Sequence, residues 1–138
     1  MKKLIAILLT GVILLSLGIP IFAAMPDNGK VQPLWNNISS LSHDLTFNGQ
    51  NGFSSAIISA STGTTEINAS LAVYKEIGDD QWEYVDHISK RITSSTRMNL
   101  SVSFTGESGA YYKSVLNVTV TKNGVDEQEI KFEYKTCP

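Results

Sequence analysis

The fold is decided by one stretch, residues 109–124, which reads G-A-Y-Y-K-S-V-L-N-V-T-V-T-K-N-G. Within it, Leu116, Val118 and Val120 share one parity, and polar side chains lie between them. Because successive side chains of a strand point to opposite faces, this alternation predicts a half-buried β-strand. The Asn-Gly pair at its end favours a tight hairpin, since primed turns need positive φ angles. Residues 129–135 are therefore expected to pair antiparallel with it, and we interpret this hairpin as the centre of a β-sandwich.

Short segments of the same kind fill the chain upstream. Turn-forming residues separate them at the spacing of about 8–12 residues that is typical of a sandwich or barrel. The first segment also has helix-like spacing at Ile38, Leu41 and Leu45, so a single helical turn stays open there. Residues 89–95 are polar and are interpreted as a crossing between sheets. The expected strands of this all-β antiparallel sandwich, about seven in number, are residues 34–47, 53–60, 66–75, 82–88, 98–105, 109–124 and 129–135.

The same alternation predicts which side chains face the interior. On the last strand the apolar residues are expected to face inward and the charged residues outward, which protects a sheet edge from pairing with another molecule. Burying one large apolar side chain contributes roughly 1.5–3 kcal/mol, so a set of this size offsets the ordering entropy of a small domain. The expected inward set is Ile57, Ile67, Leu71, Val73, Leu100, Val102, Leu116, Val118, Val120, Ile130 and Phe132.

The N-terminal part has the composition of an export signal. Two lysines precede an uncharged apolar run, and two alanines follow it, which are the parts of a secretory signal peptide. We expect a signal-peptide helix over residues 1–23 with cleavage after Ala23, a linker over residues 24–33, and one domain over residues 34–138. An uncleaved membrane anchor is the alternative, because the uncharged run is long enough to span a bilayer.

Charge and cysteine content bound the location and the partners. The whole chain has a net charge of −2, and removal of the two leader lysines leaves nine basic against thirteen acidic residues, a net charge of −4. A nucleic-acid partner is not expected, because such binding needs a concentrated basic face. The one cysteine, Cys137, has no intrachain partner and in an exported chain could pair between chains or stay a free thiol. The predicted location is secreted or cell-surface, with membrane contact only through an uncleaved N-terminal segment.

Several short motifs resemble a known family. They are Trp35-Asn36-Asn37-Ile38-Ser39, the turn Gly63-Thr64-Thr65 leading into residues 67–73, Trp82 soon after an acidic turn, and Gly109-Ala110-Tyr111-Tyr112. In that order they resemble short secreted immunoglobulin-like or fibronectin-III-like β-sandwich proteins of Gram-positive bacteria, a family of uncharacterised function. The resemblance implies fold and export and no activity. The tyrosine pair resembles the tyrosine corner of such domains, with Tyr112 as the inward ring, but Ser114 stands where an antibody domain has its second disulfide cysteine.

Residues suited to catalysis are sparse. The two histidines are His43 and His87, and His43 and its neighbour Asp44 would point apart on a strand. No serine lies in a G-x-S-x-G elbow. We therefore predict no catalytic residue and no cofactor.

Metal-binding patterns are equally weak. Two histidines and one terminal cysteine lack zinc-ligand spacing, so no metal ligand is predicted. A weak calcium site at Asp79, Asp80 or Asp126 stays open, although no EF-hand loop is present.

Four N-x-S/T triplets begin at asparagines and match the acceptor pattern for N-glycosylation. Strands rich in Asn, Ser and Thr generate this triplet by chance, and a bacterial source would generally not modify it. Occupied triplets would instead require outward-facing strand positions. The asparagines are Asn37, Asn68, Asn99 and Asn117.

The aromatic residues carry the binding hypothesis. Trp35, Trp82, Tyr84, Tyr74 and Tyr111 need not all fit inside a sandwich. Exposed rings on a sheet face can stack on sugar rings or anchor a protein partner. Packing in the core or at its rim is the other interpretation, with Trp82 as the core tryptophan. The ligand-binding candidates are Trp35, Trp82 and Tyr84.

These features predict a secreted or cell-surface β-sandwich module that is non-enzymatic and either structural or bound to a protein or glycan partner. A carbohydrate-binding module using exposed rings is the first alternative, and a small secreted hydrolase is the second. The hydrolase is distinguished by whether His43 or His87 lies within reach of a serine and a carboxylate.

Overall fold

The stretch that decides the fold forms strand β6 (Tyr111–Lys122), which lies between β3 and β7 in a four-stranded sheet. The computed structural model describes residues 34–138. The turn after β6 has φ angles of 53° at Asn123 and 73° at Gly124, so the Asn-Gly pair makes the predicted tight hairpin to β7. The signal-peptide helix and the linker expected over residues 1–33 lie outside the described residues.

Seven strands make up the described part of the chain, and it contains no helix. They pair only with antiparallel neighbours. The helical turn left open at the start of the domain is a strand instead. The bounds are β1 (Ile38–Asn48), β2 (Asn51–Ala60), β3 (Thr64–Gly78), β4 (Gln81–Thr93), β5 (Arg97–Thr105), β6 (Tyr111–Lys122) and β7 (Val125–Thr136).

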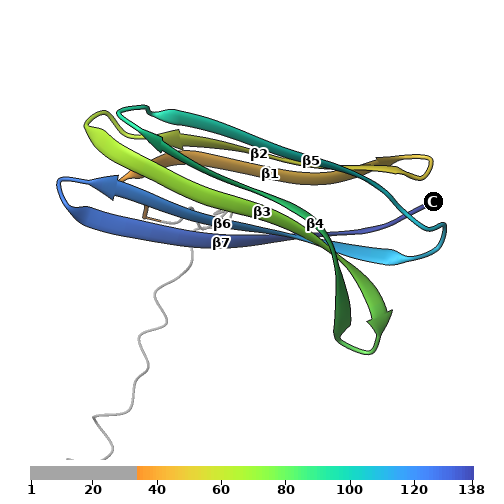
Figure 1. Ribbon diagram of the computed structural model, residues 1–138. Coiled ribbons are helices and arrows are strands. Elements are labelled where there is room, and N and C mark those ends of the chain that lie inside the picture. The colour runs from red at the N-terminus through yellow and green to blue at the C-terminus, as the bar shows by residue number, and fades with distance from the viewer. Residues whose placement is uncertain (1–33) are drawn as a thin grey trace, which may run out of the picture. The chain divides into compact units, whose positions relative to one another are not determined.

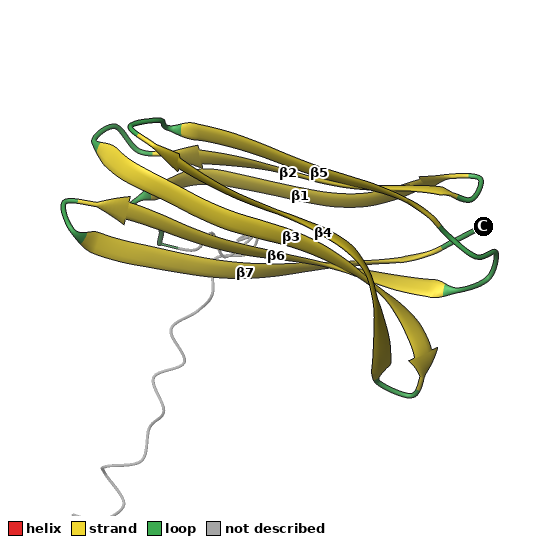
Figure 2. Cartoon of the chain, in the orientation of Figure 1, coloured by secondary structure: helices red, strands yellow, loops and turns green. Residues whose placement is uncertain are grey.

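The strands form two layers, which Figure 1 shows as a sheet of β1, β2 and β5 packed on a sheet of β3, β4, β6 and β7. The strand orders are β1-β2-β5 and β4-β3-β6-β7. Short loops join the strands (Figure 2). The predicted antiparallel sandwich is confirmed. The expected crossing between the sheets is present but shorter: it takes residues 94–96 instead of 89–95, because β4 continues to Thr93.

The core lies between the layers and is built largely by the predicted residues. From β3, β6 and β5, the side chains of Leu71, Leu116 and Leu100 are almost fully buried. Tyr112 is also inward, as predicted, and its hydroxyl accepts a hydrogen bond of 2.9 Å from the Glu107 backbone N–H. That bond to the backbone upstream is the geometry of a tyrosine corner.

Three residues of the expected inward set face outward instead, namely Ile57, Ile130 and Phe132, of which the last two are more than half exposed. Directly opposite residues on paired strands share a face, and the buried Leu116 lies opposite Lys131. The predicted parity of β7 is therefore wrong.

The physical reason is that β7 is an edge strand. Its inward side chains lie at the rim of the interior, where the long side chains of glutamate and lysine still reach water. Inward-pointing charges of this kind protect an edge strand from pairing. For Ile57 the reason is simpler: Ile57 and Ile58 are consecutive, so only one of them can enter the core.

The β3–β4 hairpin bends away from the rest of its sheet (Figure 1). The register shifts between Val73 and Tyr74, where Val85 is the extra residue on β4. Such a bulge bends the strand and changes which face the following side chains take. This explains why the parity of β4 is ambiguous in the sequence: Trp82 and Tyr84 before the bulge share a face with His87 after it.

Candidate functional site

Aromatic side chains gather on the outer face of the four-stranded sheet. The register places Tyr84 beside Tyr74, Tyr74 beside Lys113, and Lys113 beside Tyr134 on the next strand. One step further along, Trp82 and Tyr111 extend the group toward the end of the sheet. We call this group the aromatic face, and it comprises Tyr74, Trp82, Tyr84, Tyr111 and Tyr134.

The rings of the aromatic face contact one another in two groups, a trio and a pair. The Tyr111 and Tyr134 rings are nearly parallel, with 16° between their planes and 5.9 Å between centroids. The Trp82 ring lies 6.2 Å from each of them, and Tyr74 and Tyr84 form an edge-to-face pair at 6.1 Å. These separations are within the range of favourable aromatic pairs, so the rings hold one another in place while Tyr84 and Tyr134 remain about half exposed.

One cation lies within the aromatic face. The Lys113 ammonium is 4.0 Å from the Trp82 ring centroid and 5.5 Å from that of Tyr74. A cation over an aromatic ring is attracted by the negative ring face. Lys113 therefore helps to hold the indole in place.

Two apolar residues of β7 extend this surface. Ile130 is 55% exposed and Phe132 is 51% exposed, both on the outer side with Tyr134. The alternation of β7 predicted all three side chains to face inward, so none of them was expected on this surface. The signal that could have identified them is the charge on the alternate residues of β7, since an edge strand can carry its charged side chains on the inner side.

A polar depression lies on the same sheet, four to six residues along its strands from the row of Tyr74 and Lys113. Its lining includes Asn68 and Ser70 of β3 and Asn117 and Thr119 of β6, and its volume is about 140 Å³. Asn68 lies opposite Thr119 and Ser70 opposite Asn117. The outer face thus offers uncharged amides and hydroxyls beside a group of exposed rings.

Trp35, the third ligand-binding candidate, lies elsewhere. Its indole N–H donates to a carboxylate oxygen of Glu129 at 3.4 Å, and the Lys131 ammonium lies 5.4 Å from its ring. Both partners are inward-facing side chains of β7, and Trp35 packs against the core. The expectation for the two tryptophans is thereby reversed: Trp35 contacts the core, whereas Trp82 lies on the outer face.

The segment after Trp35 is held by one carboxylate. Glu127 accepts hydrogen bonds from the backbone N–H groups of Asn36, Asn37 and Ile38 at 2.9, 2.5 and 2.7 Å. Partial burial raises the pKa of Glu127, but the three backbone hydrogen bonds outweigh it and the pKa lies below its ordinary value. We call this arrangement the Glu127 clasp.

The Asn37 side chain completes the attachment of this segment. Its amide N–H groups donate to the carbonyl oxygens of Val120 and Val125, on either side of the β6–β7 turn. Asn37 is buried, so its triplet is not presented at the surface as a glycosylation acceptor would be. The asparagines of the other three triplets are exposed.

The hydrolase alternative requires a histidine within reach of both a serine and a carboxylate, and His43 meets only the first requirement. His43 Nε2 and the Ser114 hydroxyl are 2.9 Å apart, and Ser114 is 2.6 Å from the Ser54 hydroxyl. However, Ser114 is fully buried, and among the described residues His43 Nδ1 has no hydrogen-bond partner. Burial, together with the positive charge of Lys131, lowers the pKa of His43 to about 4 against an opposing effect of Asp44. The imidazole is therefore neutral at pH 7.

The remaining polar candidates are dispersed. His87 Nδ1 is 2.6 Å from the Tyr84 hydroxyl at the margin of the aromatic face, and Asp126 accepts a hydrogen bond from Thr121. Within residues 34–138, no three side chains of the metal-binding types come together. None of these residues forms a helix long and apolar enough to cross a bilayer. Cys137 is a free and buried thiol.

Comparison with known proteins assigns no family to this chain. No protein-family model matches the chain, and no curated protein matches it. Among solved structures it is similar to Spo0M, a sporulation control protein from Bacillus subtilis, with a TM-score of 0.38 and 11% identity. The match covers 72% of this chain and 49% of that protein, so the chain spans about half the length of that neighbour.

Proposed function

We propose that this chain is an exported, non-enzymatic β-sandwich module that binds a polysaccharide through the outer face of its four-stranded sheet. The observation that carries the proposal is the aromatic face, which has a contacting pair and a contacting trio of rings on one side of a sheet, with Tyr84 54% exposed. Exposed apolar surface of this kind on a small soluble domain marks an interaction site.

The chemistry beside the rings favours a sugar ligand. A pyranose presents an apolar C–H face, which stacks on an aromatic ring, and hydroxyl groups, which both donate and accept hydrogen bonds. The carboxamides of Asn68 and Asn117 and the hydroxyls of Ser70 and Thr119 can also donate and accept. These polar groups lie about 13–20 Å along the strands from the Tyr74 row, four to six residues at the rise of a β-strand. A chain of several sugar units could therefore contact both parts of the face.

A protein partner is the second candidate. The exposed Ile130 and Phe132 widen the apolar part of the surface beyond what ring stacking needs. Aromatic side chains are also enriched at the centres of protein interfaces. A glycan titration and protein capture from cell extracts distinguish the two candidates.

Export and family relationship are part of the proposal. Export is supported by the basic start, the apolar run and the small residues within residues 1–24. A fibronectin-III-like relationship is supported by the tyrosine corner and by the pairing of β4 with β3. In constant-type immunoglobulin domains the fourth strand joins the opposite sheet.

The absence of enzymatic activity is also proposed. Ser114 has no access to solvent, and the His43 imidazole is held by the interior rather than by a carboxylate. A triad needs a nucleophile that the substrate can reach and a base oriented by a third group.

The test uses the tryptophan of the aromatic face as a reporter. The chain has two tryptophans, so Trp35→Phe leaves Trp82 as the single indole. We expect its fluorescence to change when the variant is titrated with at least one of cellohexaose, xylohexaose, chitohexaose or soluble peptidoglycan fragments. Calorimetry on the unmodified chain measures the same affinity independently.

Binding should depend on the exposed rings. Tyr111→Ala with Tyr134→Ala should weaken binding on the order of 100-fold, at roughly 1.5 kcal/mol for each ring. Ile57→Ala, an apolar truncation on the opposite outer face, is the matched control and should bind as the unmodified chain does. The absence of a response to every glycan would refute polysaccharide binding. The second candidate would then be favoured if the chain captures a protein from cell extracts, the Tyr111/Tyr134 double variant does not, and Ile57→Ala still does.

A further inference from the structure

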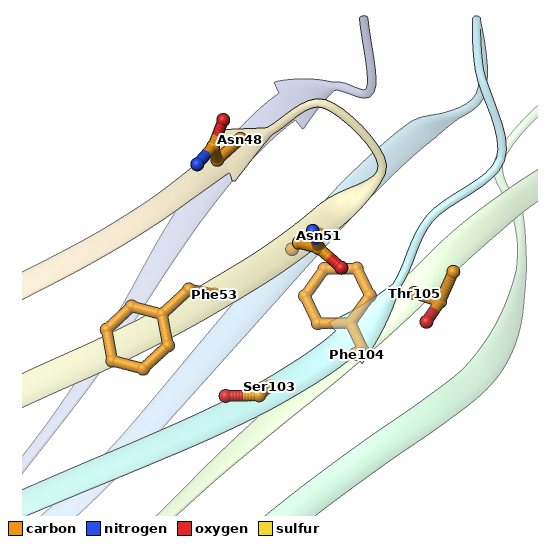
Figure 3. Close-up of a pocket in the computed structure, with 7 residues that line it drawn as sticks. Asn48, Asn51, Phe53, Ser103, Phe104 and Thr105 are labelled. Atoms are coloured by element: carbon orange, nitrogen blue, oxygen red, sulfur yellow. The ribbon is translucent and has the colours of Figure 1, made fainter.

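A second site lies on the opposite outer face, beside the β1–β2 hairpin. It is an open pocket of about 430 Å³, which is within the range of small-molecule sites, roughly 300–1,000 Å³. Figure 3 shows Asn48 and Asn51 at the hairpin and Phe53 further along the same strand, with Ser103 and Thr105 on the neighbouring strand. Gly52 and Phe104 complete its lining.

The register explains why these side chains converge. Asn48 lies opposite Asn51, and Asn51 lies opposite Thr105, so the three form one row across β1, β2 and β5. Phe53 and Ser103 lie opposite each other in the next row. Their side chains therefore all emerge on the outer face of the three-stranded sheet.

The pocket is supported from inside. A Cβ atom at Gly52 would overlap the Phe104 ring, so the ring lies directly against the Gly52 backbone. Phe104 contacts Phe47 and Tyr112 with centroid distances of 5.5 and 5.3 Å. The hairpin is also tied to the loop after β5, because the Gly106 N–H donates to the Gln50 carbonyl at 2.7 Å. This packing fixes the backbone of the pocket before a ligand arrives.

The chemistry of the lining fits a neutral sugar. None of the seven lining residues is charged, so an anion or a cation would lack a counter-charge. The two carboxamides and two hydroxyls can donate and accept hydrogen bonds, as vicinal sugar hydroxyls require. The Phe53 ring is 44% exposed and offers an apolar surface for a pyranose.

We propose that this pocket is a second glycan site and that the module is bivalent, joining two polysaccharide chains through its opposite faces. This inference rests on the proposed function of the aromatic face. Two sites on opposite sides of a rigid sandwich cannot easily bind the same stiff chain. They can hold two chains, and linked binding events raise the overall avidity without a new contact.

The experiment counts sites and measures cross-linking with the same glycans. Calorimetry of the unmodified chain with the hexasaccharide that binds should give about two ligands per protein, one for each face. Asn51→Ala with Phe53→Ala should lower this to about one, and so should Tyr111→Ala with Tyr134→Ala. With the corresponding polymer (hydroxyethylcellulose, xylan or soluble peptidoglycan), light scattering should rise with the unmodified chain and with neither double variant.

A further variant guards against a folding defect in the hairpin. Ser103→Arg fills the pocket from an exposed position on β5 and should have the same effect as the Asn51/Phe53 pair, with an unchanged thermal midpoint. Ile57→Ala, on the same outer face but outside the pocket, should keep two ligands and full cross-linking.

The possible failures are distinguishable. The first failure is that the unmodified chain binds one ligand, the tyrosine pair abolishes this binding and the pocket variants do not change it. This result overturns the second site and leaves the proposed function intact. The second failure is that the unmodified chain binds one ligand, the pocket variants abolish this binding and the tyrosine pair does not change it. This result overturns both bivalency and the proposed role of the aromatic face. Absence of binding by all glycans overturns both proposals.

Discussion

His43 illustrates how the interior of this sandwich changes the chemistry of one side chain. It is inward on β1, its Nε2 contacts Ser114 on the facing sheet, and burial lowers its pKa to about 4. The unfolded chain takes up a proton near pH 6.5, whereas the folded chain resists protonation until about pH 4. The unfolded state thus binds more protons between these values, so stability falls as the pH falls through this window and levels off below it.

We predict that the free energy of unfolding in urea decreases from pH 7 to pH 5 and that His43→Gln flattens this decrease. The glutamine can keep a hydrogen bond to Ser114 and cannot be protonated in this range. His87→Gln, which removes the exposed histidine of β4, is the matched control and should keep the slope of the unmodified chain. Equal slopes for the unmodified chain and His43→Gln would contradict the assignment.

Sequence reasoning predicted single residues well where a strand is covered on one face and has neighbours on both sides. Leu71, Leu116 and Val118 are buried as expected because β3 and β6 are central strands. It failed for Ile130 and Phe132, because an edge strand need not turn its apolar side inward. The partner of His43 was out of reach, since Ser114 is 71 residues away along the chain.

At the scale of elements, the Glu127 clasp joins the start of β1 to the β6–β7 hairpin. One carboxylate accepts three backbone N–H groups, those of Asn36, Asn37 and Ile38. Because the pKa of Glu127 is lowered, its contribution to stability is present above the unfolded value of about 4.5 and is lost as the pH falls through the folded value. This window lies below most of the His43 window, so the two effects can be separated.

We predict that Glu127→Ala lowers the free energy of unfolding at pH 7 by about 1–3 kcal/mol, the typical penalty for leaving buried donors without an acceptor. Glu127→Gln retains one acceptor oxygen and should lose less. Asp126→Ala, at the neighbouring exposed position on the same strand, is the control and should stay near the unmodified value in urea titrations. A loss at Asp126 as large as that at Glu127 would contradict the clasp.

The elements themselves were largely predictable, and their irregularities were not. All seven strands were expected, and the Asn-Gly hairpin follows from the φ preferences of those two residues. The bulge at Val85 was visible only as an ambiguous parity, because nothing in the residue types marks the extra residue. As a result Trp82 was expected in the core, although the sequence did identify Trp82, Tyr84, Tyr74 and Tyr111 as rings that could lie outside.

At the scale of the whole molecule, stability rests on the interior between the two sheets. The described domain has one cysteine, and Cys137 is only 1% exposed. We predict that residues 34–138 unfold in one cooperative thermal transition whose midpoint is the same with and without dithiothreitol, as expected of a small domain held by its core. A midpoint that falls in reductant, or a dimer on a non-reducing gel of the folded protein, would show that Cys137 pairs between chains.

The sandwich architecture followed from the alternation of apolar and polar residues, the spacing of the turns and the lack of helical periodicity. The assignment of strands to sheets did not follow, because β3 pairs with β6 and β2 pairs with β5 through contacts that no local pattern encodes. The candidate site was half predictable for the same reason. Its rings could be named, but Lys113, Tyr134 and the polar depression join them only through the register of β3, β6 and β7.

The Glu127 clasp also determines how the domain should be immobilised. It fixes Asn37 beside the β6–β7 turn, whereas Cys137, with its thiol 3.9 Å from the Gly49 carbonyl oxygen, lies next to the β1–β2 hairpin at the other end (Figure 1). A purification tag or biosensor linker placed ahead of Leu34 would therefore leave the far end unobstructed, while one added after Pro138 would crowd it. Opposite results from the two tagging schemes would reveal which end of the molecule meets its ligand.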